Sequence, residues 1–220
     1  IGKEFGVSIN GLQWIVTAYG LTLAGFLLLN GRAGDLYGHK RLFIIGVTMF
    51  SLSSLAAGLA PTLPVLIIAR AIQGFSAAMA SSTGLSILAA TFEEGRQRNR
   101  ALSVFAAVTG LGAAAGMIAG GVITATLGWR WVFDINVPIG IIIAIISIKY
   151  FSSTASTTTK HESRHLDVVG AITVTAGLML LVYALSIAQN IGIASGEVIE
   201  LLAISAGVLA AFLFIEYRSR

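Results

Sequence analysis

The sequence predicts an all-α fold, a polytopic transmembrane helical bundle, and two observations carry that prediction. Of the 220 residues, 56% are hydrophobic and only 11% are charged, whereas soluble domains carry roughly 25% charged residues. The apolar residues also form long runs, and a helix needs about 20 of them to cross a hydrocarbon core of roughly 30 Å. The runs lack the alternation of an outer-membrane barrel, so the lipid bilayer is the expected surrounding of these helices.

Seven runs are long enough to be spans. In chain order they cover residues 12–30, 42–60, 63–89, 101–127, 131–151, 168–189 and 198–217. The longest polar stretch, residues 152–167, is rich in Ser and Thr and separates five spans from the last two. We therefore expect a five-span bundle over residues 1–151, a loop over 152–167 and two linking helices over 168–220.

The charges outside the spans predict the orientation. Lys and Arg are retained on the cytoplasmic side of a membrane. Of the thirteen that lie in the connections or at the ends of spans, eleven fall on alternate sides, namely Arg32, Lys40, Arg41, Arg96, Arg98, Arg100, Lys149, Lys160, Arg164, Arg218 and Arg220. Residues 152–167 are therefore expected to be cytoplasmic and residues 60–64 external. The first span then runs inward, and an additional helix before Ile1 would place the N-terminus in the cytoplasm, as in a piece of a longer protein.

Composition also excludes several function classes. The sequence has no Cys, which excludes disulfides and thiolate metal sites, and its three His residues lack the spacing of metal ligands. It contains no catalytic triad or phosphate-binding loop, so no enzyme activity and no cofactor is expected. The net charge of +4 is attributed to the basic cytoplasmic connections, and no nucleic-acid partner is expected.

The connection after the first span is a candidate gating loop, with the residues Gly31, Asp35, Gly38, Lys40 and Arg41. Its glycines permit a tight turn. A carboxylate at the membrane edge is tolerated when it is paired, and Asp35 is expected to form an ion-pair latch with Arg32, Lys40 or Arg98. The alternative is a short turn with interfacial charges.

Arg70 interrupts the apolar third span. A charged side chain there costs at least about 2.5–3.5 kcal/mol on insertion scales, so it needs partners or a water-filled cavity. Gln73 adds a second polar group and Gly74 an open backbone surface on the same helix face. The alternative is an arginine that extends to the interface. The candidates for a cavity or proton relay are Arg70, Gln73, Gly74 and, at the start of the fifth span, Asp134.

Two further patterns follow in the fourth and fifth spans. Glycines at four-residue spacing suit close helix packing, and this predicted packing stripe consists of Gly112, Gly116, Gly120 and Gly121. Such stripes occur in many membrane bundles. The next segment contains interfacial residues and a proline that would loosen the fifth helix, and its candidate residues are Trp129, Arg130, Asn136 and Pro138.

Together these segments resemble the major facilitator superfamily. Residues 31–41 resemble its signature G-x-L-A-D-R-x-G-R-K, with departures at Ala33, Gly34, Leu36 and His39. Residues 66–78 are similar to its fourth-helix motif, an Arg followed by Gln-Gly. Residues 111–122 resemble the fifth-helix antiporter motif, although Met117 replaces its proline. Residues 129–140 resemble the W-R-W-x-F-x-I-N-x-P-x-G stretch of the fourteen-helix drug:proton antiporters.

The resemblance implies a partial major facilitator fold, with helices two to six and the two helices inserted between the bundles. It implies a secondary transporter in the membrane, expected to be the plasma membrane. That transporter would export drugs or toxic small molecules, with the proton gradient as its energy source and Arg70 in a proton relay. The C-terminal half of the same chain would be its partner. The alternatives are an uptake or inorganic-solute carrier of the same fold and a transport-dead sensor or adaptor.

Overall fold

A computed structural model describes residues 1–7, 9–150 and 168–219, and all regular structure in this part of the chain is helical. The helices are α1 (Gly2–Phe5), α2 (Ile9–Tyr37), α3 (His39–Gly58), α4 (Leu63–Thr91), α5 (Arg96–Thr126), α6 (Trp131–Asp134), α7 (Asn136–Tyr150), α8 (Val168–Ile191) and α9 (Gly196–Ser219). Seven candidate spans are long and apolar enough to cross a membrane. The predictions of an all-α fold and of a multi-pass membrane protein are confirmed, whereas the predicted loop at residues 152–167 lies outside the described residues.

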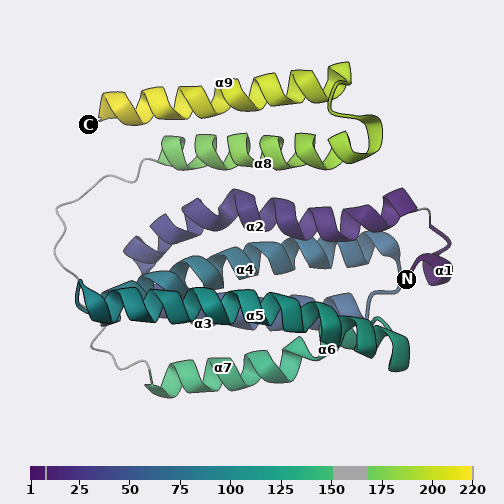
Figure 1. Ribbon diagram of the computed structural model, residues 1–220, viewed down its shortest axis with the longest axis horizontal. Helices are drawn as coiled ribbons and strands as arrows, with labels where there is room; N and C mark the ends of the chain where they lie inside the picture. Colours follow the sequence, from purple (N-terminus) through teal and green to yellow (C-terminus); the bar gives the residue numbers. More distant parts are fainter. Residues whose placement is uncertain (8, 151–167, 220) are drawn as a thin grey trace.

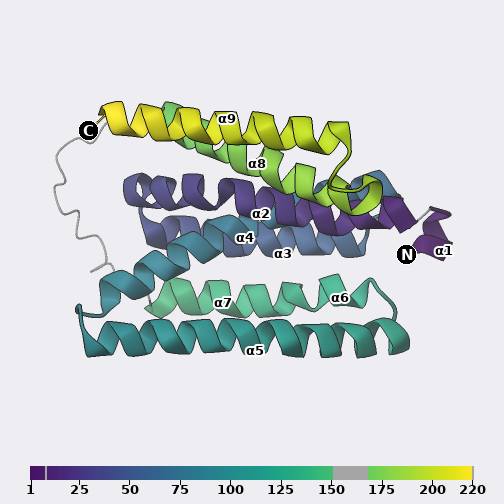
Figure 2. The ribbon, with the colours of Figure 1, turned by 45° about the horizontal axis from the view of Figure 1, so that its top comes forward.

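The long helices lie side by side along one common direction (Figures 1 and 2). α4 packs against both α2 and α3, α7 packs against α3, and α8 packs against α2 and α9. Helix α5 packs less closely than the other long helices, with its main contacts to α4 and α6, and it forms one edge of the molecule in Figure 2. The α2–α3–α4 group is therefore the centre of the fold.

The expected gating loop is a single-residue turn between two helices. α2 continues to Tyr37 and α3 begins at His39, so Gly38 alone connects them, with a φ of 91°. Glycine adopts this left-handed conformation without steric cost. The polar residues before Gly38 remain part of α2, which has 29 residues. A helix of this length extends about 43 Å at 1.5 Å per residue, more than the roughly 30 Å of a hydrocarbon core, so these residues do not need to lie inside the core. Their charged side chains can therefore remain in water while the backbone stays helical.

The fifth predicted span is divided into α6 and α7 at Ile135. Pro138 lies three residues later and has no N–H to donate to the carbonyl of Asp134, which leaves the helical ladder incomplete at this point. The side-chain amide of Asn136 donates to the carbonyls of Val132 and Phe133, both at 3.2 Å. These bonds hold the two short helices together where the backbone ladder is interrupted.

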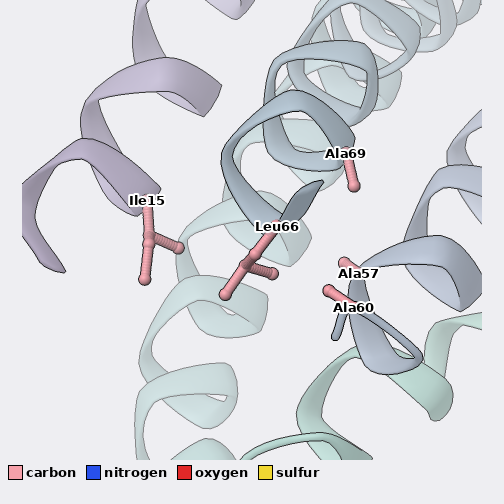
Figure 3. Packing of buried hydrophobic residues seen from close by; sticks show 5 residues of the cluster. All are labelled: Ile15, Ala57, Ala60, Leu66 and Ala69. Atoms are coloured by element: carbon pink, nitrogen blue, oxygen red, sulfur yellow. The ribbon is translucent and has the colours of Figure 1, made fainter. Parts of the chain in front are cut away.

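Small residues allow the central helices to approach closely. A Cβ at Gly46 on α3 would lie 2.9 Å from the backbone nitrogen of Ala80 and 3.1 Å from the carbonyl of Ser76 on α4. Packing of this kind replaces the hydrophobic driving force that is absent between helices in lipid. At one end of the contact, a buried cluster joins α2, α3 and α4 through Ile15, Ala57, Ala60, Leu66 and Ala69 (Figure 3).

Consecutive connections between the spans are predicted to lie on opposite sides of the membrane, and this orientation can be tested directly. The predicted external connection contains Thr62, and the predicted cytoplasmic connection between α4 and α5 contains Glu93; both residues are exposed. We expect a cysteine at Thr62 to react with an impermeant maleimide on intact cells and a cysteine at Glu93 to react only after permeabilisation. The opposite pattern would refute the orientation that the basic residues predict.

Candidate functional site

Arg70 on α4 points into the helix bundle. Its Nε donates to the carbonyl of Ile15 at 3.1 Å, and a terminal nitrogen donates to the side-chain oxygen of Gln73. The guanidinium carbon lies 4.2 Å from the ring centroid of Tyr19 and 5.7 Å from that of Phe133. These partners come from α2, α4 and α6. Of the two alternatives for this residue, the structure therefore has the one in which the side chain is turned inward.

Gln73 extends this polar contact to α3. The amide is 1% exposed, and its nitrogen donates to the hydroxyl of Ser54, which is fully buried. Arg70, Gln73 and Ser54 therefore form a hydrogen-bonded chain, which a low-dielectric surrounding strengthens. A guanidinium stays protonated, so this chain can position a charge or water molecules, whereas a separate group must carry a proton.

Gly74 is a packing residue, which corrects the expectation of an open backbone surface beside Arg70. A Cβ at Gly74 would overlap the carbonyl oxygen of Tyr19 and the hydroxyl of Thr22 on α2. Because α2 and α4 approach so closely here, the glycine is buried. Its absent side chain allows Tyr19 to reach the guanidinium of Arg70.

Asp134 does not pair with Arg70. One carboxylate oxygen of Asp134 is buried without a hydrogen-bond partner among the described residues, and the side chain lies against Gly58 of α3. The preceding residue, Phe133, contacts the Arg70 guanidinium instead. The structure therefore places Asp134 near Arg70 in the fold without bringing the two charges together, and the described residues contain no metal-binding group of three or more acidic or His side chains.

The side-chain partner of Asp35 is local. Its carboxylate lies 3.2 Å from Nε2 of His39, one helical turn further along the chain. Arg98, an expected latch partner, pairs instead with Glu94 at 3.1 Å. The expected latch between Asp35 and Arg98 is therefore not formed, because each residue has a partner four positions away. Of the remaining candidates, Gly31 and Lys40 are partly buried and Arg41 is exposed.

Trp129 and Arg130 belong to a polar cluster that the sequence did not indicate. The indole nitrogen of Trp129 donates to Glu4 at 2.8 Å, and Arg130 forms an ion pair with the same carboxylate. Arg130 also donates to the carbonyl of Ala60 at 3.4 Å, and its guanidinium lies 4.4 Å from the Trp129 ring centroid. Trp129 is therefore held by contacts within the protein, and its expected place at the membrane interface stays a prediction.

These contacts lower the pKa of Glu4, first through the hydrogen bond from Trp129 and then through that from Arg130. A carboxylate with a lowered pKa stabilises the folded state above its ordinary pKa, and the contribution is lost when the pH falls through the lowered value. The contacts of Glu4 are therefore expected to persist at neutral and mildly acidic pH.

The packing stripe on α5 has no partner in the described part of the chain. No atom lies within 4 Å of a Cβ built at Gly112, Gly116, Gly120 or Gly121, and no residue of α5 is buried. The predicted close contact of the stripe therefore has no counterpart among the described helices, and it stays a prediction. The main contacts of α5 in the described structure are with α4 and α6.

Sequence reasoning missed Glu4, Tyr19, Ser54 and Phe133. Glu4 and Arg130 are 126 positions apart and Gln73 and Ser54 are 19 apart, so no local pattern pairs them. The two aromatic residues are ordinary members of apolar runs. One signal was available, because a buried arginine requires partners and aromatic rings commonly supply them.

Comparison with known proteins identifies the family of the chain. The profile of the Major Facilitator Superfamily matches residues 1–216. The chain is 41% identical over 216 residues, 98% of its length, to the uncharacterized MFS-type transporter EfpA of Mycobacterium tuberculosis. It is 37% identical over its whole length to the cephamycin export protein CmcT of Amycolatopsis lactamdurans, and 35% identical over 99% of its length to the puromycin resistance protein pur8 of Streptomyces alboniger.

The chain spans 40%, 44% and 42% of the lengths of these three relatives, respectively. The match to the superfamily nevertheless extends over nearly all of the present sequence and includes every helix described above except the last three residues of α9. The chain therefore belongs to the major facilitator superfamily of membrane transporters, and it is not an enzyme.

Proposed function

We propose that the protein containing this chain is a proton-coupled exporter of drugs or other toxic small molecules, in the fourteen-helix branch of the superfamily. The observation that carries the proposal is the inward Arg70, hydrogen-bonded to Gln73 and, through it, to Ser54. A buried, permanent positive charge is costly in a membrane. Its presence in α4 therefore favours a functional role over a purely structural one. The names of the relatives, a puromycin resistance protein and a cephamycin export protein, support export as the direction.

Arg70 would act on a carboxylate that carries the proton. Because a guanidinium stays charged, it favours the ionised form of a nearby acid and makes proton release easier. Asp134 is the candidate within this chain, since its buried oxygen has no partner among the described residues. A change in the contact between Phe133 and Arg70 would be needed before the two charges meet. An acid in another part of the protein is the other source.

The exposed face of α5 supports the proposal of a second helical bundle in the same protein. Met117, Ile118 and Leu111 are 80%, 72% and 71% exposed, and the glycine stripe leaves room for a close helix partner. Substrate paths in this superfamily lie between two bundles related by an axis along the membrane normal. The C-terminal half of the protein is therefore proposed to pack along α5, with the five-span bundle and the linking pair α8–α9 on the other side of the contact.

A transport experiment in cells tests the exporter proposal. The full-length protein is expressed in a drug-sensitive bacterial host, which is then exposed to a panel that includes puromycin and a cephamycin. We expect raised resistance and faster loss of preloaded drug, and both effects should disappear when a protonophore collapses the proton gradient. Increased drug accumulation would indicate an uptake carrier, and unchanged flux of all drugs would contradict the proposal.

Asp35 is proposed to act in gating, as part of a pair with His39 at the turn between α2 and α3. We expect Asp35→Asn to lower the maximal transport rate about tenfold while the substrate concentration for half-maximal rate changes less than twofold, because the residue lies at the end of the bundle, on another part of α2 than the Arg70 contacts. Glu94→Gln, which weakens a similar local pair with Arg98, is the matched control. Loss of binding with an unchanged maximal rate would show that Asp35 contacts substrate.

A further inference from the structure

The strongest group of contacts outside the Arg70–Gln73–Ser54 chain lies at the predicted external end of the bundle. We define the Glu4 cluster as Glu4, Phe5, Trp129, Arg130 and Phe133. The ring centroids of Phe5 and Trp129 are 5.8 Å apart, and those of Trp129 and Phe133 are 6.1 Å apart, both in edge-on geometry. Such aromatic pairs add specific packing to their area burial. The cluster joins α1, the α5–α6 turn and α6 into one contact.

The Glu4 cluster leads directly to Arg70. Phe133 is its innermost member, and its ring centroid lies 5.7 Å from the Arg70 guanidinium carbon. Phe5, Trp129 and Phe133 also pack against the buried group of Ile15, Ala57, Ala60, Leu66 and Ala69 (Figure 3). The aromatic members of the Glu4 cluster therefore belong to the same packed group as Ile15, whose carbonyl accepts from Arg70, and Ala69, which precedes Arg70.

The first residues of the sequence contribute to this packed group through the short helix α1 and the turn that follows it. α1 ends at Gly6 in the left-handed conformation, with a φ of 62°, and the N–H of Val7 bonds to the carbonyl of Gly2 at 3.2 Å. This helix-ending motif turns the chain back toward α2. Glu4 then attaches the segment to Trp129 and Arg130, and Arg130 also bonds to the end of α3 through the carbonyl of Ala60.

We propose that the Glu4 cluster is an external closure of the Arg70 site, with Glu4 as the residue that holds it shut. When the bonds of Glu4 break, α1 and the α5–α6 turn separate, Trp129 loses its fixed position, and Phe133 no longer covers the guanidinium. Arg70 then becomes accessible to water from the predicted external side. The proposal rests on the proposed function for the meaning of the Arg70 site and on the predicted orientation for the word external.

Cysteine accessibility tests the closure without any transport measurement. The full-length protein, with any cysteines outside this chain replaced by serine, carries a single reporter, Ala69→Cys. Ala69 precedes Arg70 and is only 4% exposed. An impermeant maleimide is added outside intact cells, and its rate of reaction is compared with that of Thr62→Cys, which is exposed. We expect the Ala69 reporter to react at least about 100-fold more slowly, because a buried side chain reacts only when the structure opens locally.

Glu4→Ala should raise the reaction rate of the Ala69 reporter about tenfold, since charge-assisted hydrogen bonds to one carboxylate are lost. Phe133→Ala should raise it further, and Glu4→Gln, which keeps an oxygen acceptor, should have an intermediate effect. Glu94→Ala breaks an exposed ion pair at the other end of the bundle and should leave the rate unchanged. Only monodisperse, surface-expressed variants are compared, so that misfolding does not count as opening.

An unchanged Ala69 rate in both Glu4→Ala and Phe133→Ala would overturn the closure. Equal acceleration by Glu94→Ala would also overturn it, because the effect would then be general loosening. Since the reaction needs neither substrate nor a proton gradient, its outcome is independent of the exporter proposal. A protein that fails to transport drugs can still show the closure, and an exporter can lack it.

Discussion

Arg70→Ala should abolish proton-coupled transport while the protein still inserts and folds. The side chain contacts α2 through Ile15 and Tyr19, α6 through Phe133 and α3 through Gln73 and Ser54. Removing a positioned group of a proton-transfer site commonly costs about 100-fold or more in rate, and we expect at least that loss. The measurement is drug flux in proteoliposomes with and without an imposed pH gradient.

Arg70→Lys should retain about a tenth of the coupled flux. Lysine keeps the positive charge, but its single ammonium lacks the planar fork with which arginine reaches the carbonyl of Ile15 and the amide of Gln73 together. Arg98→Ala is the matched control, because Arg98 is an arginine whose pair with Glu94 is exposed. Wild-type pH-driven flux in a well-folded Arg70→Ala variant would show that the charge has no part in coupling.

Gly74→Val should prevent normal folding of the bundle. A side chain at this position overlaps the backbone carbonyl of Tyr19 as well as the hydroxyl of Thr22. Overpacking usually costs about 1–3 kcal/mol, and the upper end is expected here because a helix backbone cannot move aside like a flexible side chain. We expect at least a threefold loss of monodisperse protein in gel filtration and a lower melting temperature.

The control for Gly74→Val is Gly207→Val on α9. In the described structure no atom lies within 4 Å of a Cβ built at Gly207, so the same change in helix propensity occurs without the overlap. Its yield and melting temperature should stay near those of the unmodified protein. Equal damage from both substitutions would assign the effect to valine in a helix rather than to the α2–α4 contact.

The sequence predicted the number and order of the spans because span length is a local property. A run of about 20 apolar residues satisfies its own backbone hydrogen bonds as a helix in lipid whatever its neighbours are. The end of α2 was not predicted, because the length of an apolar run does not define where the helix itself ends. The polar residues before Gly38 end the apolar run, but helical structure continues through them to Tyr37.

The site was only partly predictable. Arg70 stood out because an arginine in an apolar run needs a partner, yet the identity of the partners depends on helix packing. Gly74 illustrates the limit, since a glycine beside a polar residue can be an open surface or a tight contact, and only the position of Tyr19 decides between them. Glu4 could not be assigned at all, because its partners lie about 125 positions away.

The central proposal, that drug movement and proton movement are coupled in this protein, is tested most directly in proteoliposomes. The full-length protein is reconstituted with a pH-sensitive dye inside and no imposed gradient, and a drug to which it confers resistance is added outside. The proposal predicts that the interior becomes more alkaline as the drug enters, because protons leave in exchange, and that Arg70→Ala removes this signal. Drug entry above the level of empty liposomes with no change in internal pH would contradict it.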